Sequence, residues 1–295
     1  MKVVVIGGDG QLGRDIVAVF AGAGEAVTPL THADIEISSL ESVKKLLTAL
    51  QPDVVVNTAA FHHVEKCESD AVLAFAVNGL GARHVARVTD SLQAKLVHIS
   101  TDYVFDGQKQ APYTEADSPA PLNVYGNTKL SGEFLVRCSN PRHFVVRVSA
   151  LYGLHPCRAK GGLNFVELML KLSKEKDKLR VVDDECVTPT PTIEVARQLA
   201  VLAATSEYGL YHATAEGSCS WYEFARAIFD LTDTKVRLER ARPGDYPVKV
   251  PRPKYSVLEN AALKSKSLNV FADWRSGLET YLAHRKAEAK SAGAG

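Results

Sequence analysis

The chain has 295 residues, of which 46% are hydrophobic and 23% are charged, as expected for a globular protein with a sizeable core. Its 35 lysines and arginines balance 34 aspartates and glutamates, so overall charge gives no basis for binding nucleic acid or a membrane surface. Five scattered cysteines without a CxxC pair indicate reduced thiols, and no stretch is long and apolar enough for a signal sequence or a membrane span. We therefore expect a cytoplasmic protein.

The first residues predict a dinucleotide-binding unit. A β-branched strand over residues 2–6 leads into a glycine-rich turn and then into an amphipathic helix over 14–20. Gly7 and Gly10 let the backbone turn tightly beside a pyrophosphate, and Gly13 permits close packing of helix on sheet. The helix N-terminus would then offer free N–H groups to the phosphates. The spacing G-x-x-G-x-x-G is typical of short-chain reductases of the extended type.

The end of the second strand, over residues 26–30, bears on the choice of cofactor. Many NAD-specific sites place a carboxylate directly after this strand to bind the ribose 2′-hydroxyl. Here the strand is followed by Thr31, and Asp34 and Glu36 come only later. The missing early carboxylate removes a repulsion against a 2′-phosphate, so we expect NADPH, with NADH also possible.

The remaining pattern predicts an α/β fold, a doubly wound parallel sheet of the Rossmann type with a smaller C-terminal substrate-binding subdomain. Further buried strands follow at βαβ spacing, over residues 53–57, 95–99 and 144–148. A single long helix is expected over 70–91. We assign residues 1–150 to the dinucleotide-binding domain, which also receives about 192–213. Residues 151–295 form mainly the substrate-binding subdomain.

Three side chains form a candidate catalytic set after the fourth strand. Tyr125 and Lys129 are one helical turn apart and leave the same face of a helix. An ammonium about 4 Å from a phenol would lower its pKa by about three units, towards neutral pH. Thr101 could donate a second hydrogen bond to a substrate carbonyl. The Tyr-x-x-x-Lys spacing alone is weak, since a tyrosine on a packed helix beside a solvated lysine gives the same pattern.

Two further patterns are each open to two interpretations. His63 and Cys67 have the i,i+4 spacing of a metal pair, but ordinary surface or pocket residues fit the absence of a second cluster better, so no metal is expected. The stretch 241–256 is rich in prolines and cations, and it is either a solvated basic loop or a phosphate clamp for a nucleotide-bearing substrate. Its cations are Arg242, Lys249, Arg252 and Lys254.

Several blocks together resemble the dTDP-4-dehydrorhamnose reductases of the extended short-chain dehydrogenase/reductase superfamily. These blocks are STDYVFDG at 100–107, YGNTK at 125–129, VVDDECVTPT at 181–190, SWYEFARAI at 220–228 and RPKYSVL at 252–258. The resemblance covers essentially the whole chain. It implies reduction of the C4 ketone of dTDP-4-dehydro-L-rhamnose by NAD(P)H, giving dTDP-L-rhamnose.

The resemblance also implies roles for individual residues. Thr101, Tyr125 and Lys129 fall on the catalytic positions, and Thr101 and Asp102 on positions that face the sugar. The cofactor positions, together with the glycines above, are Gln11, Leu12, Glu36, Ile37, Ala59, Ala60, Phe61, Tyr125 and Lys129. The implied partner is a small-molecule nucleotide sugar, and the sequence is compatible with a homodimer.

Some positions depart from the family pattern. Ala150 follows Ser149 where the family usually has a tryptophan that packs on the substrate, and Glu36 stands where an aspartate is common. The wider sugar pocket leaves a different nucleotide keto-sugar open as substrate. A catalytically idle homologue that binds NADP(H) and regulates a partner enzyme is the alternative from another functional class.

Overall fold

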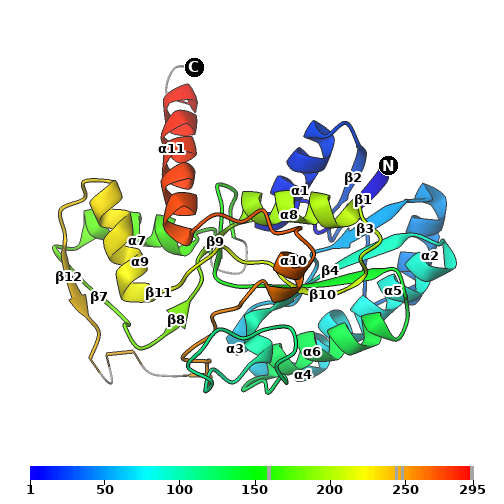
Figure 1. Ribbon diagram of the computed structural model, residues 1–295, viewed down its shortest axis with the longest axis horizontal. Coiled ribbons are helices and arrows are strands. Elements are labelled where there is room, and N and C mark those ends of the chain that lie inside the picture. The colour runs from blue at the N-terminus through cyan, green and yellow to red at the C-terminus, as the bar shows by residue number, and fades with distance from the viewer. Residues whose placement is uncertain (158–160, 243–244, 247–248, 293–295) are drawn as a thin grey trace.

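A computed structural model describes residues 1–157, 161–242, 245–246 and 249–292. Its centre is a six-stranded parallel sheet in the order β10-β5-β4-β3-β1-β2 (Figure 1). The strands are β1 (Lys2–Ile6), β2 (Ala26–Leu30), β3 (Val54–Asn57), β4 (Lys95–Thr101), β5 (His143–Val148) and β10 (Gly209–His212). The strand order reverses between β1 and β3, which confirms the predicted doubly wound sheet.

Helices cover both faces of this sheet, and the side chains of β1 show why. Val3 and Val5 belong to one core cluster and Val4 and Ile6 to another, because successive side chains of a strand point to opposite faces. The first cluster is closed by α1 (Gln11–Gly22) and α8 (Thr192–Ala203). The second is closed by α2 (Leu40–Leu50), α5 (Ala82–Ser91) and α6 (Val124–Arg137). Each fully buried valine of these strands contributes roughly 1.5–3 kcal/mol.

The single helix expected over 70–91 is instead broken into three pieces. It begins as α4 (Ala71–Phe75), passes through one π-helical turn, η1 (Ala76–Gly81), and continues as α5. A preceding short helix, α3 (Val64–Ser69), ends at Asp70. The π turn holds Asn78 in the interior, where the side chain is only 1% exposed. Such single π turns inside α-helices occur frequently at functional sites.

A smaller lobe is built from the C-terminal half around its own core. Figure 1 shows α7, α9, β7 and β12 together at one end of the molecule, with α11 standing beside them. The aromatic side chains of Tyr152, Phe224 and Tyr281 pack together in this core. The remaining elements are η2 (Asp102–Val104), β6 (Leu151–Tyr152), α7 (Phe165–Glu175), β7 (Lys178–Val181), β8 (Cys186–Val187), β9 (Thr190–Pro191), β11 (Cys219–Ser220), α9 (Trp221–Leu231), β12 (Arg237–Arg240), α10 (Ala261–Ser265) and α11 (Trp274–Ala292).

Residues 251–258, which we call the strap, join the two lobes. The Asn123 side chain, at the start of α6, donates to the carbonyl of Pro251 at 2.9 Å. The backbone of Cys186 in β8 donates to Lys254 and accepts from Ser256. The strap therefore passes between the start of α6 in the sheet domain and the smaller lobe. Within the described ranges, we find no helix with the length and apolarity that crossing a membrane requires.

Candidate active site

The glycine-rich turn after β1 forms a cradle for an anion. Gly7 adopts φ +80°, which favours glycine, and its carbonyl accepts from the Gly10 N–H at 2.9 Å. Gly10 is the N-cap of α1, no side chain caps the helix, and no acidic residue lies in its first turn. The first N–H groups of α1 are thus left for a ligand, and the positive end of the helix dipole favours a negative one. These features fit the diphosphate of a dinucleotide.

Gln11 and Leu12 differ in what they offer to that ligand. The Gln11 side-chain amide donates to the His155 carbonyl at 3.0 Å, so it ties the turn to the loop after β6. The Leu12 side chain is 8% exposed and packs in the first core cluster. Both residues can therefore offer the cradle only their backbone N–H groups.

Gly13 is the glycine of this turn that tolerates substitution least. A Cβ at this position would lie 2.1 Å from the Gly7 carbonyl oxygen, so a side chain would push the helix off the turn. We expect Gly13→Ala to weaken NADPH binding by about tenfold or more, since overpacking costs about 1–3 kcal/mol. Gly22→Ala, at the other end of α1 with nothing within 4 Å, is the control. Titration of NADPH fluorescence on both variants tests this, and equal affinities would contradict it.

The segment after β2 has no free carboxylate beside the strand end. Asp34 accepts from the Thr31 N–H at 2.8 Å and from its hydroxyl at 2.7 Å. Glu36 accepts from the backbone and hydroxyl of Ser38, and the Ser38 N–H lowers the pKa of this carboxyl. The Ile37 side chain is 4% exposed and belongs to the second core cluster. Glu36 therefore stabilises the loop after β2 through its hydrogen bonds to Ser38, and Ile37 anchors the same loop in the core.

The segment after β3 is pinned by Asn78. The Asn78 amide oxygen accepts from the Phe61 N–H at 2.8 Å, and the amide nitrogen donates to the Phe61 carbonyl at 3.0 Å. The same nitrogen contacts the Thr128 hydroxyl of α6 at 3.0 Å. Ala59, Ala60 and Phe61 are half-buried at the carboxyl end of the sheet. The π turn thus fixes the predicted cofactor-binding segment against the helix that carries the catalytic pair.

His63 and Cys67 have separate partners in the structure. Cys67 donates its thiol hydrogen to the Phe61 carbonyl at 3.2 Å, and burial raises the pKa of the thiol to about 11. His63 Nδ1 lies 3.3 Å from the Glu65 carboxylate. Among the residues that the structure describes, no group of three or more His, Cys, Asp and Glu side chains is placed to hold a metal ion.

Thr101, Tyr125 and Lys129 converge at the carboxyl end of β4. The Asn123 side chain caps α6 by accepting from the Gly126 N–H at 2.9 Å, which sets the turn that carries Tyr125. The Thr101 hydroxyl is close enough to the Tyr125 phenol to act on it, and it lowers the pKa of the phenol against the larger effect of burial. Lys129 points inward and donates from Nζ to the Ile99 carbonyl at 2.6 Å. The predicted spacing thus places all three groups at one point of the fold.

The electrostatics differ from the sequence-based expectation. Burial raises the pKa of the Tyr125 phenol, and the Asp102 carboxylate acts in the same direction. Burial lowers the pKa of the Lys129 ammonium to about 8, while the Glu133 carboxylate opposes that shift. The expected lowering of the phenol's pKa by the lysine is therefore wrong for this structure, because desolvation of the phenol dominates.

Asp102, expected to face the sugar, is 4% exposed and holds hydroxyl groups of the protein. It accepts from Thr101 Oγ1 and from Ser149 Oγ, each at 2.9 Å. Burial raises the pKa of this carboxyl, and the nearby Ser256 of the strap opposes that shift. Ala150, expected to line the sugar pocket, is half-buried and adopts φ +44°. A left-handed conformation is unusual for alanine and directs the chain from β5 into β6.

A buried ionic network behind the catalytic strand was missed by sequence reasoning. Arg147 of β5 makes two hydrogen bonds to Glu133 of α6, at 2.9 and 2.7 Å, and both side chains are 2% exposed. Ser100 donates to the same carboxylate at 2.5 Å, and Arg147 lies 3.4 Å from His212. One signal was available: Glu133 lies one helical turn after Lys129, on the face that the lysine occupies.

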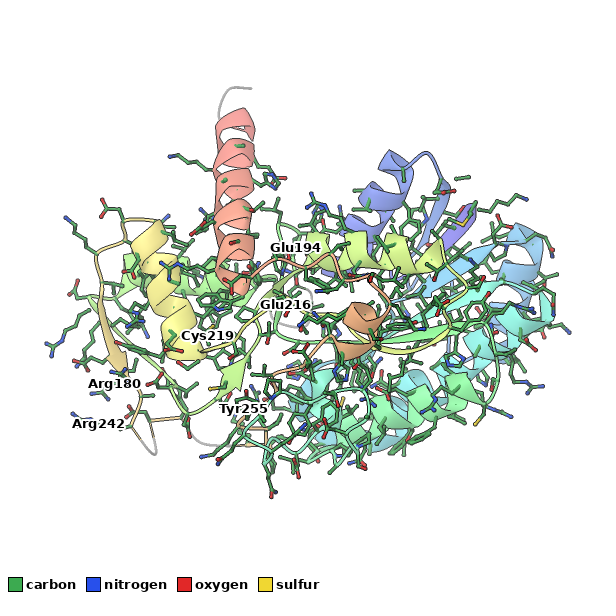
Figure 2. All side chains as sticks on the ribbon, in the orientation of Figure 1. Arg180, Glu194, Glu216, Cys219, Arg242 and Tyr255 are labelled. Carbon is green, nitrogen blue, oxygen red and sulfur yellow. The ribbon has the colours of Figure 1, made fainter. Side chains whose placement is uncertain are left out.

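The basic stretch 241–256 does not form one cluster. Arg242 is at the outer edge of the smaller lobe (Figure 2). Lys254 pairs with Asp184 at 3.0 Å, and both side chains are well exposed. Arg252 reaches the sheet domain, where it bonds Glu65 at 2.7 Å. The contacts of Arg252 and Lys254 and the position of Arg242 thus do not bring these three cations together, and the phosphate-binding interpretation stays a prediction, with Arg252 as its candidate.

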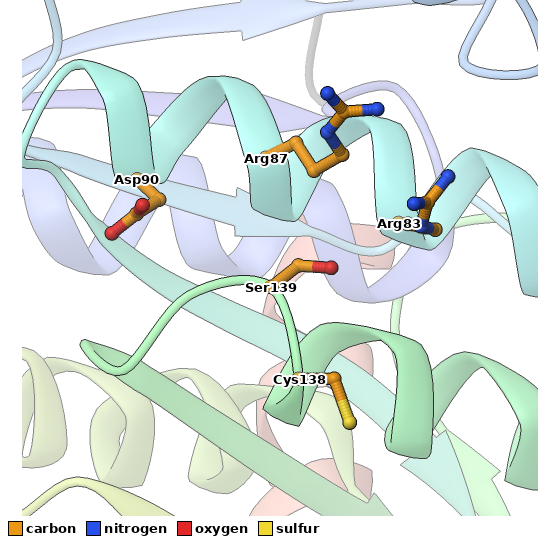
Figure 3. Close-up of a pocket in the computed structure, with 5 residues that line it drawn as sticks. All are labelled: Arg83, Arg87, Asp90, Cys138 and Ser139. Atoms are coloured by element: carbon orange, nitrogen blue, oxygen red, sulfur yellow. The ribbon is translucent and has the colours of Figure 1, made fainter.

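A hollow of about 500 Å³ between α5 and the C-terminal end of α6 is not the catalytic cleft (Figure 3). Its walls include Arg83, Arg87 and Cys138. It lies at the opposite end of α6 from Tyr125. Ligands of doubly wound sheets bind outside the carboxyl ends of the strands, so chemistry is expected at Thr101 rather than here.

The sheet, its glycine-rich first turn and the Thr–Tyr–Lys set define an extended short-chain dehydrogenase/reductase. The family described as RmlD substrate binding domain matches residues 1–287. The chain is 39% identical over 284 residues to the spore coat polysaccharide biosynthesis protein SpsK of Bacillus subtilis, covering 96% of this chain and 98% of that protein. It is 36% identical over 277 residues to the dTDP-4-keto-6-deoxy-D-glucose reductase of Streptomyces niveus, covering 93% and 94%.

Solved structures give the same result. The dTDP-4-dehydrorhamnose reductase of Clostridium acetobutylicum superposes with a TM-score of 0.92 at 38% identity, covering 97% of this chain and 100% of that one. The enzyme of Bacillus anthracis, in complex with NADP, gives a TM-score of 0.91 at 34% identity, covering 96% and 99%. The chain belongs to the dTDP-4-dehydrorhamnose reductase (RmlD) family.

Proposed function

We propose that the chain is an NADPH-dependent reductase that converts the C4 ketone of dTDP-4-dehydro-L-rhamnose to the alcohol, giving dTDP-L-rhamnose. The observation that carries this proposal is the placement of Thr101 beside Tyr125 at the carboxyl end of β4, with Lys129 buried one turn beyond. The family relationship supports the substrate class. The presence of all three candidate catalytic residues, Thr101, Tyr125 and Lys129, also favours an enzyme over a catalytically idle regulatory homologue.

In this proposal, one group of residues binds the cofactor and another donates the proton. The turn at Gly10 and the backbone N–H groups of Gln11 and Leu12 would bind the diphosphate of NADPH, which when bound supplies the hydride for the ketone carbon. The segment of Ala59, Ala60 and Phe61 would line the cofactor's path across the strand ends. We assign residues 151–295, apart from the helix and strand within 192–213, to substrate binding.

Tyr125 is the proton donor in the proposed reaction. The electron pair of the ketone π bond moves to oxygen as the new C–H bond forms at C4. The phenolic O–H bond breaks and an O–H bond forms on the sugar, leaving a phenolate near the Lys129 ammonium. General acid catalysis of this type contributes about 10²- to 10⁴-fold.

The pKa of the Lys129 ammonium predicts how the rate of the reaction depends on pH. Its pKa is lowered to about 8, so the ammonium is charged below that pH and loses its proton above it. We expect kcat/KM to fall as the pH rises through about 8, because the charged form binds the cofactor and stabilises the phenolate. Lys129→Met should be slow and lack this dependence. Rates that stay constant from about pH 7 to about pH 9.5 would remove the lysine from the mechanism.

A second candidate substrate is dTDP-4-keto-6-deoxy-D-glucose. A relative carries the name of a reductase for that sugar, and Ala150 leaves more space than the tryptophan common in the family. Assaying both keto-sugars with NADPH and with NADH separates the candidates by their kcat/KM ratios. We expect dTDP-4-dehydro-L-rhamnose with NADPH to be the preferred combination. The homodimer stays a prediction, which light scattering of the purified protein can measure.

A further inference from the structure

A buried polar pair lies beside the predicted cofactor-binding segment, on the face of the sheet that α5 and α6 cover. Asn57 is the last residue of β3, and His98 lies opposite it in the parallel register with β4. Each of the two residues is 1% exposed. The residues two positions earlier on the same face, Val55 and Leu96, belong to the second core cluster. The face therefore changes from apolar to polar at the carboxyl end of the sheet, where ligands of this fold bind.

The direction of each hydrogen bond in this pair follows from a backbone group. The Ala59 N–H can only donate, so the atom of Asn57 that it meets at 3.2 Å is the amide oxygen. The amide nitrogen of Asn57 therefore faces His98 Nδ1, at 3.3 Å, and donates to it. Burial lowers the pKa of His98 well below its usual value, and the Lys129 ammonium acts in the same direction, so the ring is neutral. The ring then accepts at Nδ1 and carries its hydrogen on Nε2.

The second ring nitrogen of His98 makes no hydrogen bond to the part of the chain that the structure describes. Nε2 is buried, and no described group accepts from it. It faces the backbone of α6, since a Cβ at Gly132 would lie 3.4 Å from it. A buried donor without a partner is destabilising, so this nitrogen does not stabilise the fold. What the imidazole offers its surroundings is the acceptor at Nδ1.

The segment held by this pair lies directly against the glycine-rich turn. A Cβ at Gly7 would lie 2.5 Å from Thr58 Oγ1 and 3.3 Å from the Ala59 nitrogen, so the two loops approach too closely for a side chain at this position. The Thr58 hydroxyl fixes the approach by donating to the Ile6 carbonyl at 2.8 Å. A shift of Ala59 would therefore move one wall of the cradle in which a diphosphate is expected. The other end of the segment is held separately, by the π turn.

We propose that His98 is a positioning residue for the cofactor: its Nδ1 holds the Asn57 amide, and the oxygen of that amide holds the Ala59 N–H beside the glycine-rich turn. This deepens the proposed function and rests on it in one respect, that NADPH is the ligand of this turn. The arrangement requires a neutral acceptor at the δ position of residue 98. Without that acceptor the Asn57 amide is free to rotate, and the Ala59 N–H loses its fixed partner.

Two substitutions of similar size at residue 98 test the role of the acceptor. His98→Asn places an amide oxygen at the δ position and keeps an acceptor, whereas His98→Leu fills similar space without one. We expect His98→Leu to weaken NADPH binding about 3- to 10-fold, the equivalent of one hydrogen bond, and His98→Asn to stay within about twofold of the wild type. Fluorescence titration of NADPH measures both affinities. Hydrogen exchange of the Ala59 amide, followed by NMR without NADPH, should be faster than in the wild type only for His98→Leu.

A control for packing lies on the same strand. Leu96 is fully buried, and Leu96→Ala should destabilise the protein by leaving a cavity under the same face. This substitution touches neither hydrogen bond of the pair, so its NADPH affinity should equal that of the wild type. A loss of affinity in Leu96→Ala as large as that in His98→Leu would show that packing is the cause, and it would overturn the proposal.

The remaining outcomes separate this proposal from the proposed function. Equal NADPH affinities of His98→Leu and His98→Asn would overturn the proposal, whether both are weakened or neither is. So would a ¹⁵N NMR spectrum of the wild type in which His98 carries its proton on Nδ1, and that result needs no variant to fold. A wild type that binds NADPH yet reduces neither keto-sugar would refute the proposed function alone. A wild type that binds no NADPH would overturn both.

Discussion

Tyr125→Phe should lower kcat by about 10²- to 10⁴-fold, because the ketone oxygen loses its proton donor. Phenylalanine keeps the ring that packs edge-on against Tyr103, so the site should retain its shape. The glycine-rich turn lies on another element, and NADPH affinity should therefore be unchanged. Stopped-flow measurement of NADPH consumption, together with fluorescence titration of NADPH, separates the two effects.

The matched control removes a phenolic hydroxyl elsewhere. Tyr208 packs its ring against Phe144 with centroids 5.3 Å apart, on the edge of the first core cluster. Tyr208→Phe should react at the wild-type rate. Turnover of Tyr125→Phe close to that of Tyr208→Phe would show that another group supplies the proton.

Arg147→Met should lower the free energy of unfolding by about 3–5 kcal/mol, since it leaves the Glu133 carboxylate buried without its partner. The two side chains are each 2% exposed, so water cannot replace the lost hydrogen bonds. Urea unfolding followed by circular dichroism measures the change. The same carboxylate opposes the burial shift of Lys129, so the damage reaches the catalytic helix as well.

Two further variants show whether loss of the buried ion pair itself causes the expected destabilisation. Arg275→Met breaks a pair with Glu279 whose side chains are 49% and 54% exposed, and it should cost no more than about 1 kcal/mol. Replacing both members of the buried pair, as Glu133→Leu with Arg147→Met, should recover much of the loss. Equal destabilisation by Arg147→Met and Arg275→Met would contradict the assignment of the buried pair.

The sheet could be predicted because its strands are buried on both faces. Runs such as Val3–Ile6 are continuously apolar, and their alternation with helices specifies a parallel order. The convergence of the candidate catalytic residues could be predicted from local spacing, since Tyr125 and Lys129 are one turn apart on one helix and Thr101 ends a strand at the same edge. Each of these signals is carried by neighbours in the chain.

The features that could not be predicted depend on contacts between residues far apart in the sequence, and such contacts leave no local sequence pattern. The single helix expected over 70–91 is interrupted because Asn78 turns inward to hold Phe61, and nothing near Asn78 in the sequence announces a π turn. The shift of the Lys129 pKa follows from burial, which spacing does not reveal. Asp102 was expected to face the sugar, yet its partners Ser149 and Ser256 come from segments far along the chain.

The central claim is a hydride transfer to the sugar ketone with a proton from Tyr125. It is tested most directly by incubating the protein with dTDP-4-dehydro-L-rhamnose and NADPH deuterated at the nicotinamide C4, then locating the deuterium in the product by NMR. The expected result is dTDP-L-rhamnose with deuterium at C4 of the sugar in the wild type, and almost none with Tyr125→Phe. Unlabelled substrate recovered from the wild type, with the NADPH unconsumed, would contradict the claim.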